Sequence, residues 1–190
     1  MSRWEPNAAE RLVAAAVELF AERGYDAVTI VEIAERAGLT KRTLFRHFSD
    51  KREILFHGQD SYRDLFAAAI RDTPAEGSPL EAIRAAATVF AAGFAYERRE
   101  FLAKRQAVIN DTPELQERDL LKAASLTAAM VTALTQRGVE LVTAKLTANI
   151  GALALGDAFH DWLQPGNKES MATLSQRALQ RFSTAITKLS

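Results

Sequence analysis

Residues 29–55 read TIVEIAERAGLTKRTLFRHFSDKREIL, and this stretch decides the fold of the N-terminal part of the chain. Thr29 and Glu32 have the spacing of a capping box, in which a hydroxyl and a carboxylate three residues apart close the start of a helix. Thr40 can cap a second short helix in the same way. The connection between the two helices is short and contains Gly38, which is typical of a helix-turn-helix.

The second of these helices, expected over residues 41–48, has the pattern of a helix that reads DNA. A recognition helix lies in the major groove, so it needs an apolar rear face and polar side chains in front. The sequence offers residues for both faces: Leu44, Phe45 and Phe48 for the rear, and Lys41, Arg42, Thr43 and Arg46 for the front.

Positive charge gathers in the same region. Residues 36–52 contain six basic residues and one acid, a local net charge of +5 in a chain whose formal net charge is zero. Such a concentration is expected where a protein contacts DNA phosphates. The N–H groups at the start of the next helix, near Ser49 and Asp50, are expected to form a second anion site beside Lys51. The alternative is a solvated charged face, which is also common in proteins that bind no DNA.

The rest of the chain also has the pattern of helices. Alanine and leucine are abundant, and no stretch alternates with the period of two that is typical of strands. The sequence therefore predicts an all-α fold of about nine helices, with a three-helix helix-turn-helix domain over residues 1–50 and an irregular helical bundle over 51–190. Besides the two short helices, the expected helices are 7–23, 50–71, 79–98, 99–110, 113–136, 139–163 and 168–189.

The composition argues against several classes of protein. The chain has 190 residues and no cysteine, so disulfides and thiolate chemistry are excluded. No window of 18 uninterrupted apolar residues predicts a membrane span, and residues 1–10 lack the pattern of a signal peptide. We therefore expect a cytoplasmic protein.

Catalytic motifs are also missing from the sequence. His47, His57 and His160 are scattered, and there is no G-x-S-x-G motif and no phosphate-binding glycine loop. No pair of histidines has the spacing that places two metal ligands on one helix face. We expect neither an enzyme nor a bound cofactor or metal.

Over residues 14–55 the sequence resembles the N-terminal domain of the TetR family of repressors. The resemblance covers about the first third of the chain. The matching residues run in order through the first three helices and into the fourth: Phe20, Gly24, Tyr25, Thr29, Ile33, Ala34, Ala37, Gly38, Leu44, Phe45, His47, Phe48, Lys51 and Leu55.

The resemblance implies which residues contact DNA: Lys41, Arg42, Thr43 and Arg46 face the DNA, and Thr40, His47 and Lys51 contact phosphates. For His47 the alternative is a packing or capping role. Two positions depart from the family pattern. Phe45 stands where family members usually have tyrosine, so it lacks the hydroxyl for a phosphate and is assigned to packing. Arg42 stands where a small residue is common, and we predict that it reads guanine, a contact worth roughly 1–3 kcal/mol of discrimination, or grips a phosphate.

The resemblance also implies a homodimer formed through the last two long helices, 139–163 and 168–189, and a two-fold symmetric operator requires two recognition helices. The first of these helices is rich in small residues, and the second carries an apolar stripe: Met171, Leu174, Ala178, Phe182, Ile186 and Leu189. The alternative is that both are core helices of a monomer.

A ligand pocket is expected among the helices between residues 79 and 163. Its candidate lining residues are Phe90, Phe94, Phe101, Met130, Phe159 and Trp162, and Arg105, in a basic cluster with Arg98, Arg99 and Lys104, is the candidate for an anionic head group. For each of these residues the alternative is an ordinary core or solvated position.

Three stretches resemble actinobacterial members of the family that sense acyl-CoA-like or other lipophilic molecules: MSRWEP at residues 1–6, ERRE followed by RQ at 97–106, and NDTPELQERDLLK at 110–122. The prediction is a one-component transcriptional repressor that a small lipophilic ligand releases from a palindromic operator. The alternatives are a regulator controlled by a protein partner, one without a ligand, and an activator.

Overall fold

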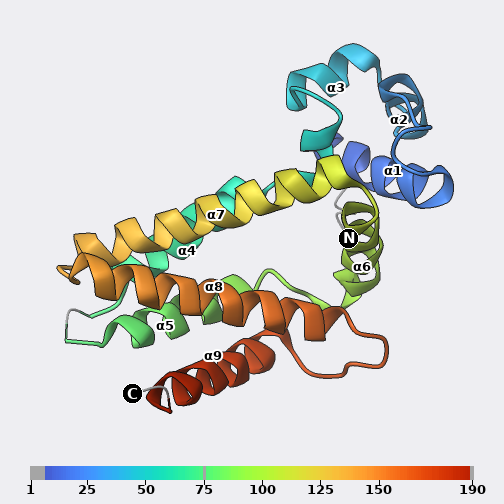
Figure 1. Ribbon diagram of the computed structural model, residues 1–190. Coiled ribbons are helices and arrows are strands. Elements are labelled where there is room, and N and C mark those ends of the chain that lie inside the picture. The colour runs from blue at the N-terminus through green and yellow to red at the C-terminus, as the bar shows by residue number, and fades with distance from the viewer. Residues whose placement is uncertain (1–6, 75, 189–190) are drawn as a thin grey trace, which may run out of the picture. The chain divides into compact units, whose positions relative to one another are not determined.

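A computed structural model describes residues 7–74 and 76–188 of the chain (Figure 1). All regular structure in these residues is helical, with nine α-helices and two short 3-10 helices. This confirms the predicted all-α fold. The sequence start MSRWEP and Leu189, both used in the predictions above, lie outside the described residues.

Figure 1 labels the α-helices in chain order. The elements are α1 (Ala8–Arg23), α2 (Ile30–Arg36), α3 (Lys41–His47), η1 (Arg52–Phe56), α4 (Gln59–Asp72), α5 (Pro79–Ala91), η2 (Tyr96–Arg98), α6 (Arg99–Asn110), α7 (Pro113–Gln136), α8 (Leu141–Leu163) and α9 (Met171–Thr187).

Two helices are shorter than the sequence predicts. The helix expected over residues 50–71 is divided into η1 and α4, because the backbone at Gly58 takes a φ of 83°, which interrupts a right-handed helix. The helix expected over 79–98 ends at Ala91. Tyr62 packs so closely on the turn at Gly93 that a Cβ there would lie 2.8 Å from the ring, and only η2 follows before α6.

The described helices gather into two compact units. The N-terminal unit contains the chain up to Gly58 together with Glu100–Leu120, and the C-terminal unit contains Gln59–Arg99 together with the residues from Leu121 onward. The N-terminal unit is thus larger than the domain expected over residues 1–50, because a segment far along the chain joins it.

Segment 100–120 joins the N-terminal unit through both apolar and charged contacts. Val108, Ile109 and Leu115 are buried in one cluster with the core residues of α1, α2 and α3. The guanidinium of Arg118 donates to the Glu53 carboxylate of η1, which raises the pKa of that arginine. These contacts make the start of α7 part of the unit that carries the helix-turn-helix.

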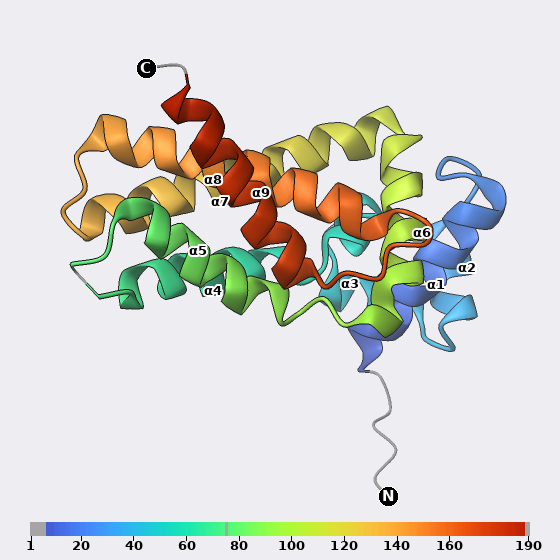
Figure 2. The same cartoon turned by 90° about the horizontal axis from the view of Figure 1, so that it is seen from below.

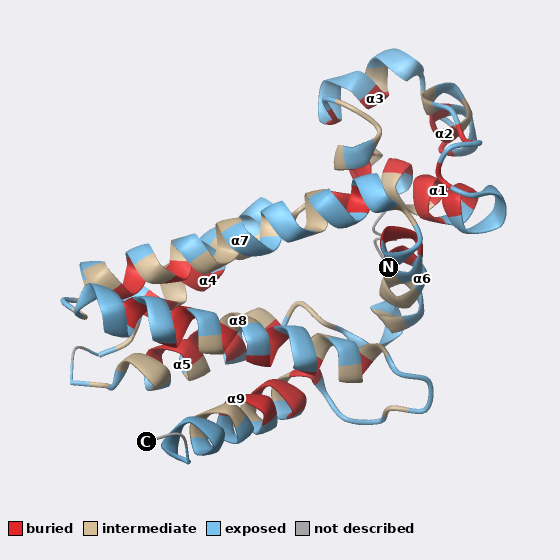
Figure 3. Ribbon diagram, in the orientation of Figure 1, coloured by how far each residue is buried: buried red, intermediate tan, exposed pale blue. Residues whose placement is uncertain are grey.

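The C-terminal unit is a helical bundle in which small residues allow close packing. Figure 2 shows α9 lying across α5 and α8, and α9 contacts both. A Cβ at Gly151 of α8 would lie 2.9 Å from Cγ2 of Ile83 of α5, so only glycine permits this approach. Along α8, buried and exposed faces alternate (Figure 3).

No helix in the described part of the chain combines the length and the apolar character that crossing a membrane requires.

Candidate nucleic-acid interface

The start of α2 is closed by the capping box that the sequence predicts. The Glu32 N–H donates to the Thr29 hydroxyl at 3.3 Å, and the Thr29 N–H donates to the Glu32 carboxylate at 2.7 Å. Arg23 donates to the same carboxylate at 2.8 Å. Hydrogen bonds from the Thr29 backbone and hydroxyl, with a smaller contribution from Arg23, lower the pKa of Glu32 to about 2.

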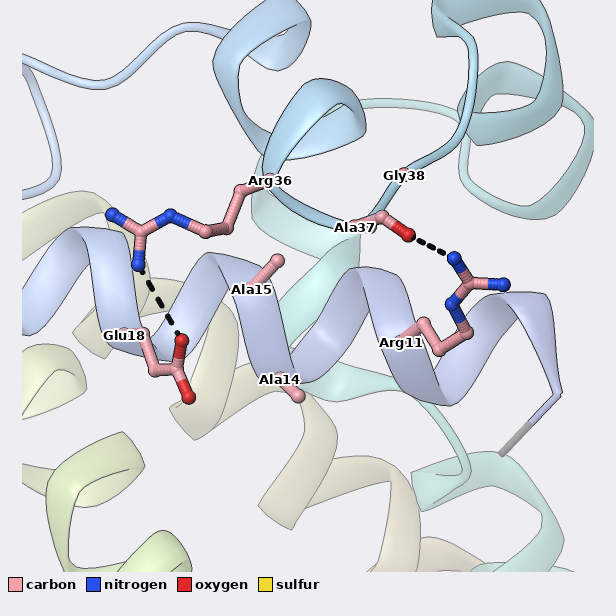
Figure 4. A pocket seen from close by; sticks show the side chains of 7 residues that line it. All are labelled: Arg11, Ala14, Ala15, Glu18, Arg36, Ala37 and Gly38. Atoms are coloured by element: carbon pink, nitrogen blue, oxygen red, sulfur yellow. Dashed lines mark hydrogen bonds and ion pairs between the residues drawn. The ribbon is translucent and has the colours of Figure 1, made fainter. Parts of the chain in front are cut away.

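The turn between α2 and α3 is held against α1. Gly38 adopts a φ of 65°, and the Arg11 guanidinium of α1 donates to the Ala37 carbonyl. An open depression of about 390 Å³ lies at this junction, lined by Arg11, Ala14, Ala15, Glu18, Arg36, Ala37 and Gly38 (Figure 4). Both of its arginines are occupied by neighbours, since Arg36 pairs with Glu18 at 3.5 Å and with Glu22 at 3.1 Å. These contacts support the turn.

Thr40 fixes the start of α3. The Thr43 N–H donates to the Thr40 hydroxyl oxygen at 3.1 Å, and the two hydroxyls lie 3.0 Å apart. Both residues were predicted to contact DNA, and both also serve the helix cap. Thr40 remains exposed, whereas Thr43 is half-buried.

The recognition helix buries one side and exposes the other. Leu44 is fully buried and Phe48 almost so, as the sequence predicts for the rear face. Four of the predicted DNA-contacting residues of α3 are exposed: Lys41, Arg42, Arg46 and His47. The exception is Phe45, which was assigned to the rear face. Its surface is 45% exposed, so that assignment was wrong. Phe45 follows Leu44 by about 100° around the helix, and this turns it away from the core.

Three of the six basic side chains in the cluster 36–52 form ion pairs or hydrogen bonds with other residues of the protein. Arg36 pairs with α1, and Arg52 pairs with Asp50 at 3.3 Å and with Glu114 at 3.3 Å. Lys51 points inward. Its ammonium donates to the carbonyls of Tyr25 at 2.9 Å and Val28 at 3.1 Å.

The ammonium of Lys51 also lies 3.9 Å from the centre of the Tyr25 ring. This geometry gives Lys51 a structural role that the sequence did not reveal, and its phosphate contact stays a prediction.

The second anion site expected near Ser49 is closed by the protein itself. The Asp50 carboxylate accepts hydrogen bonds from the N–H groups of Arg52 at 2.9 Å and Glu53 at 3.1 Å. A carboxylate already occupies these donors, so that expectation was wrong. Lys41, Arg42 and Arg46 are the cations of the cluster that form no ion pair with any residue in the described ranges. Within the cluster of residues 36–52, the unpaired positive charge therefore lies on α3.

Four of the predicted ligand-binding residues come together in the C-terminal unit. Phe94 is the centre of the group, with its ring centroid 4.9 Å from that of Phe90, 5.7 Å from that of Phe159 and 5.6 Å from that of Trp162. Phe90, Phe94 and Phe159 are half-buried, and Trp162 is buried. Met130 is also buried in this unit, where its sulfur would lie 3.6 Å from a Cβ at Gly151.

The other two predicted ligand-binding residues belong to the N-terminal unit. Phe101 packs against its core, and Arg105 is buried there, with its Nε donating to the Leu55 carbonyl of η1. Burial lowers the pKa of Arg105. Phe101 and Arg105 therefore belong to a different compact unit from the aromatic group around Phe94.

Two aromatic residues of α4 were missed from the candidate pocket. Tyr62 lies 5.7 Å from Phe90 and 6.2 Å from Phe94, and Phe66 lies 5.8 Å from Phe90, between ring centroids. Their spacing of four residues places them on one helix face, which was the available signal.

The N-terminal segment matches a known family. Residues 12–57 match the family model described as bacterial regulatory proteins of the tetR family. TcmR, an HTH-type transcriptional regulator from Streptomyces glaucescens, is 36% identical over 77 residues, which are 40% of this chain and 34% of TcmR. The chain thus spans about a third of the length of that relative.

A longer match reaches into the C-terminal unit. MftR from Mycobacterium tuberculosis, named as a putative mycofactocin biosynthesis transcriptional regulator, is 27% identical over 154 residues, covering 78% of this chain and 76% of MftR.

Two solved structures share the fold over nearly the whole chain. SmeT from Stenotrophomonas maltophilia, in complex with triclosan, superposes with a TM-score of 0.66 at 19% identity and covers 95% of this chain and 91% of its own. The FadR repressor from Thermus thermophilus, in complex with lauroyl-CoA, gives a TM-score of 0.56 at 20% identity, with coverages of 92% and 93%. All four proteins are named as regulators and none as an enzyme, as the sequence predicts for this chain.

Proposed function

Because this chain belongs to the TetR family by its N-terminal domain, we propose that it is a transcriptional regulator that binds operator DNA through α3. One observation carries the proposal: three unpaired cations, Lys41, Arg42 and Arg46, stand on the exposed side of a capped, rigidly supported recognition helix. Such a surface can contact both phosphates and base edges in the major groove. Arg42 is assigned to guanine or to a phosphate, Thr43 to the side of α3 that faces the DNA, and Thr40, His47 and Lys51 to phosphate contacts.

Selection of bound sequences from a random duplex library tests this function. The wild type should enrich an inverted repeat, and the Lys41→Ala/Arg42→Ala variant should not. The matched control is Arg71→Ala/Lys188→Ala, which removes two exposed charges from the C-terminal unit and should select the same repeat. Selection by neither the wild type nor the control, at low salt where phosphate contacts are strongest, would exclude DNA binding.

The proposed regulator acts as a homodimer. Val142, Leu146 and Leu153 of α8 expose 61%, 62% and 58% of their surfaces and lie on one face. An apolar face of this kind is typical of an interface. The apolar stripe of α9 supports the dimer less than the sequence suggested, since Met171, Leu174 and Ala178 are buried within the subunit.

Sedimentation of a Leu146→Asp variant tests the dimer. A charge in the middle of a buried interface should produce monomers, because its desolvation is uncompensated. Leu65→Asp, on an exposed position of α4, is the control and should remain dimeric. If the Leu146→Asp variant remains dimeric, this face of α8 is not part of the subunit interface.

We further propose that a small lipophilic ligand binds beside Phe90, Phe94 and Phe159 and releases the DNA. The half-buried rings of this group favour an apolar ligand. We take the class of ligand from the two solved structures named above, which are complexes with triclosan and with lauroyl-CoA. Repression is proposed rather than activation, as in those two repressors. The chain passes between the units after Gly58, Arg99 and Leu120, so ligand-induced movement of the C-terminal unit can act on the other unit at three points.

Reciprocity tests the release mechanism. A ligand that weakens DNA binding must itself bind less tightly, by the same factor, when operator DNA is present. Long-chain acyl-CoA and triclosan are the first probes, measured by calorimetry with and without the selected operator. Equal affinity in both conditions would exclude release by that ligand. If neither probe nor any apolar compound binds, control by a protein partner becomes the better function.

A further inference from the structure

Phe45 is an exposed aromatic residue on an otherwise polar helix face. Its immediate neighbour Leu44 is fully buried, while 45% of the Phe45 surface is accessible. On a helix, residues three and four apart are neighbours, so Phe45 lies one turn from Lys41 and Arg42. The Lys41 ammonium is 5.8 Å from the centre of the Phe45 ring. The ring is therefore part of the same surface as the unpaired cations.

The fold itself gives no reason for a phenylalanine at this position. Phe45 is absent from the cluster of buried residues that forms the core of the N-terminal unit, and its ring contacts no other aromatic ring in the described part of the chain. The 45% of the Phe45 surface that stays in water gains nothing from folding. A partner that removes the ring from water accounts for it, and the cations on either side favour a polyanionic partner.

We propose that Phe45 contacts the C5-methyl group of a thymine in the major groove and adds a base preference to DNA binding. This inference rests on the proposed function, because it requires α3 to enter the groove. Thymine is the base that presents a methyl group there, and an aromatic ring is an apolar partner for it. Phenylalanine has neither a donor nor an acceptor, so it can hydrogen-bond to no phosphate and to no polar base edge.

The contact predicts a measurable dependence on one methyl group. Burial of a single aliphatic carbon is worth about fourfold in affinity. A dimer would make the contact in both half-sites, so removal of both methyl groups should weaken binding roughly 16-fold. The strength of phosphate contacts, by contrast, does not depend on the methyl group.

The experiment replaces thymines of the selected operator, one symmetric pair at a time, by deoxyuridine, which pairs with adenine but lacks the methyl group. Binding is measured for the wild type and for Phe45→Ala. At one thymine position the wild type should lose roughly 16-fold in affinity, whereas Phe45→Ala should bind the two duplexes equally. Leu65→Ala is the matched control, because Leu65 is also 45% exposed but belongs to the C-terminal unit, and it should retain the wild-type dependence.

Two results would overturn the inference while leaving the proposed function intact. The wild type could bind the operator with an affinity that no thymine methyl group changes, or Phe45→Ala could lose the same factor as the wild type at the sensitive position. If the wild type selects no operator, the proposed function fails first and this inference fails with it. Equal melting temperatures of the wild type and Phe45→Ala would show that any loss of binding does not arise from unfolding.

Discussion

The two units of this protein are both helical, but each unit is stabilised by a different kind of internal contact. In the N-terminal unit, α2 and α3 have only seven residues each, and both begin at a threonine cap. Helices this short are not stable alone, so they depend on their caps and on one shared core. In the C-terminal unit, α8 has 23 residues and packs through alanine, glycine and aromatic side chains.

The units also differ in how they treat exposed side chains. In the N-terminal unit three of the six basic residues of the cluster 36–52 are paired or turned inward, and the other three lie on α3. In the C-terminal unit α8 exposes three large apolar side chains on one face, Val142, Leu146 and Leu153. The comparison teaches that charge marks the proposed DNA surface, whereas unburied apolar area marks the proposed subunit interface.

The largest expected effect lies in the aromatic group of the C-terminal unit. Trp162 is 1% exposed and packs against Phe94 and Phe159, so Trp162→Ala should lower the free energy of unfolding by about 3–5 kcal/mol. Guanidinium denaturation followed by circular dichroism measures it, with the exposed Tyr96→Ala as the control. A loss below about 1 kcal/mol would mean that the Trp162 ring borders open space. Trp162 would then be a residue that lines a pocket rather than a packed core residue.

The next effect compares two neighbours on α3. Leu44→Ala should cost about 2–5 kcal/mol of stability because Leu44 is fully buried in the core. Phe45→Ala should leave the free energy of unfolding nearly unchanged and should weaken DNA binding instead. The same denaturation experiment, combined with operator binding, separates the two roles. Comparable stability losses for both variants would show that Phe45 contributes to the core as Leu44 does.

A smaller effect compares the capping boxes of the two units. Thr29 closes α2 and Ser78 closes α5 with the same pair of hydrogen bonds. Thr29→Ala and Ser78→Ala should each cost about 1 kcal/mol. Thr29→Ala should also weaken DNA binding, since α2 supports the recognition helix. Equal DNA binding by the two variants would show that the cap of α2 serves stability alone.

The smallest effect is a dependence on pH. Hydrogen bonds from Thr29 lower the pKa of Glu32 from its ordinary 4.5 to about 2, so this carboxylate stabilises the fold above pH 4.5, and the contribution is lost as the pH falls from there towards 2. Carbon-13 titration of the Glu32 carboxyl group measures the pKa, which Thr29→Ala should raise. Glu81, in the matching box of α5, should also titrate below its ordinary range. A Glu32 pKa near 4.5 would contradict the observed cap.

Sequence-based prediction was most successful where the signal is local. The caps at Thr29 and Thr40 were both predicted, because a cap involves residues only three positions apart. The grouping of Phe90, Phe94, Phe159 and Trp162 was also predicted, on the basis of residue type and an expected pocket. It failed to include Tyr62 and Phe66 of α4, since the pocket was expected among the helices between residues 79 and 163.

Three features of the site lay beyond the sequence. Lys51 resembles its basic neighbours in the chain, but its ammonium donates hydrogen bonds to the carbonyls of Tyr25 and Val28, which are more than 20 positions away. Arg105 looked like an anchor for an anionic ligand, yet it is buried beside Leu55. Phe45 looked like a core residue. For Lys51 and Arg105 the deciding neighbour is distant in the chain, and the residue type alone does not identify it.

The sequence by itself determined that this protein is all-helical, that residues 29–48 form a helix-turn-helix, and that Lys41, Arg42 and Arg46 lie on the outer face of its second helix, because helix periodicity and caps are properties of neighbouring residues. Only the tertiary structure decided that residues 100–120 join the N-terminal unit, that Gly58 separates η1 from α4, and that Phe45 faces outward. These outcomes depend on which surfaces meet when distant segments pack, and burial of apolar area, the main force in that choice, is not directional.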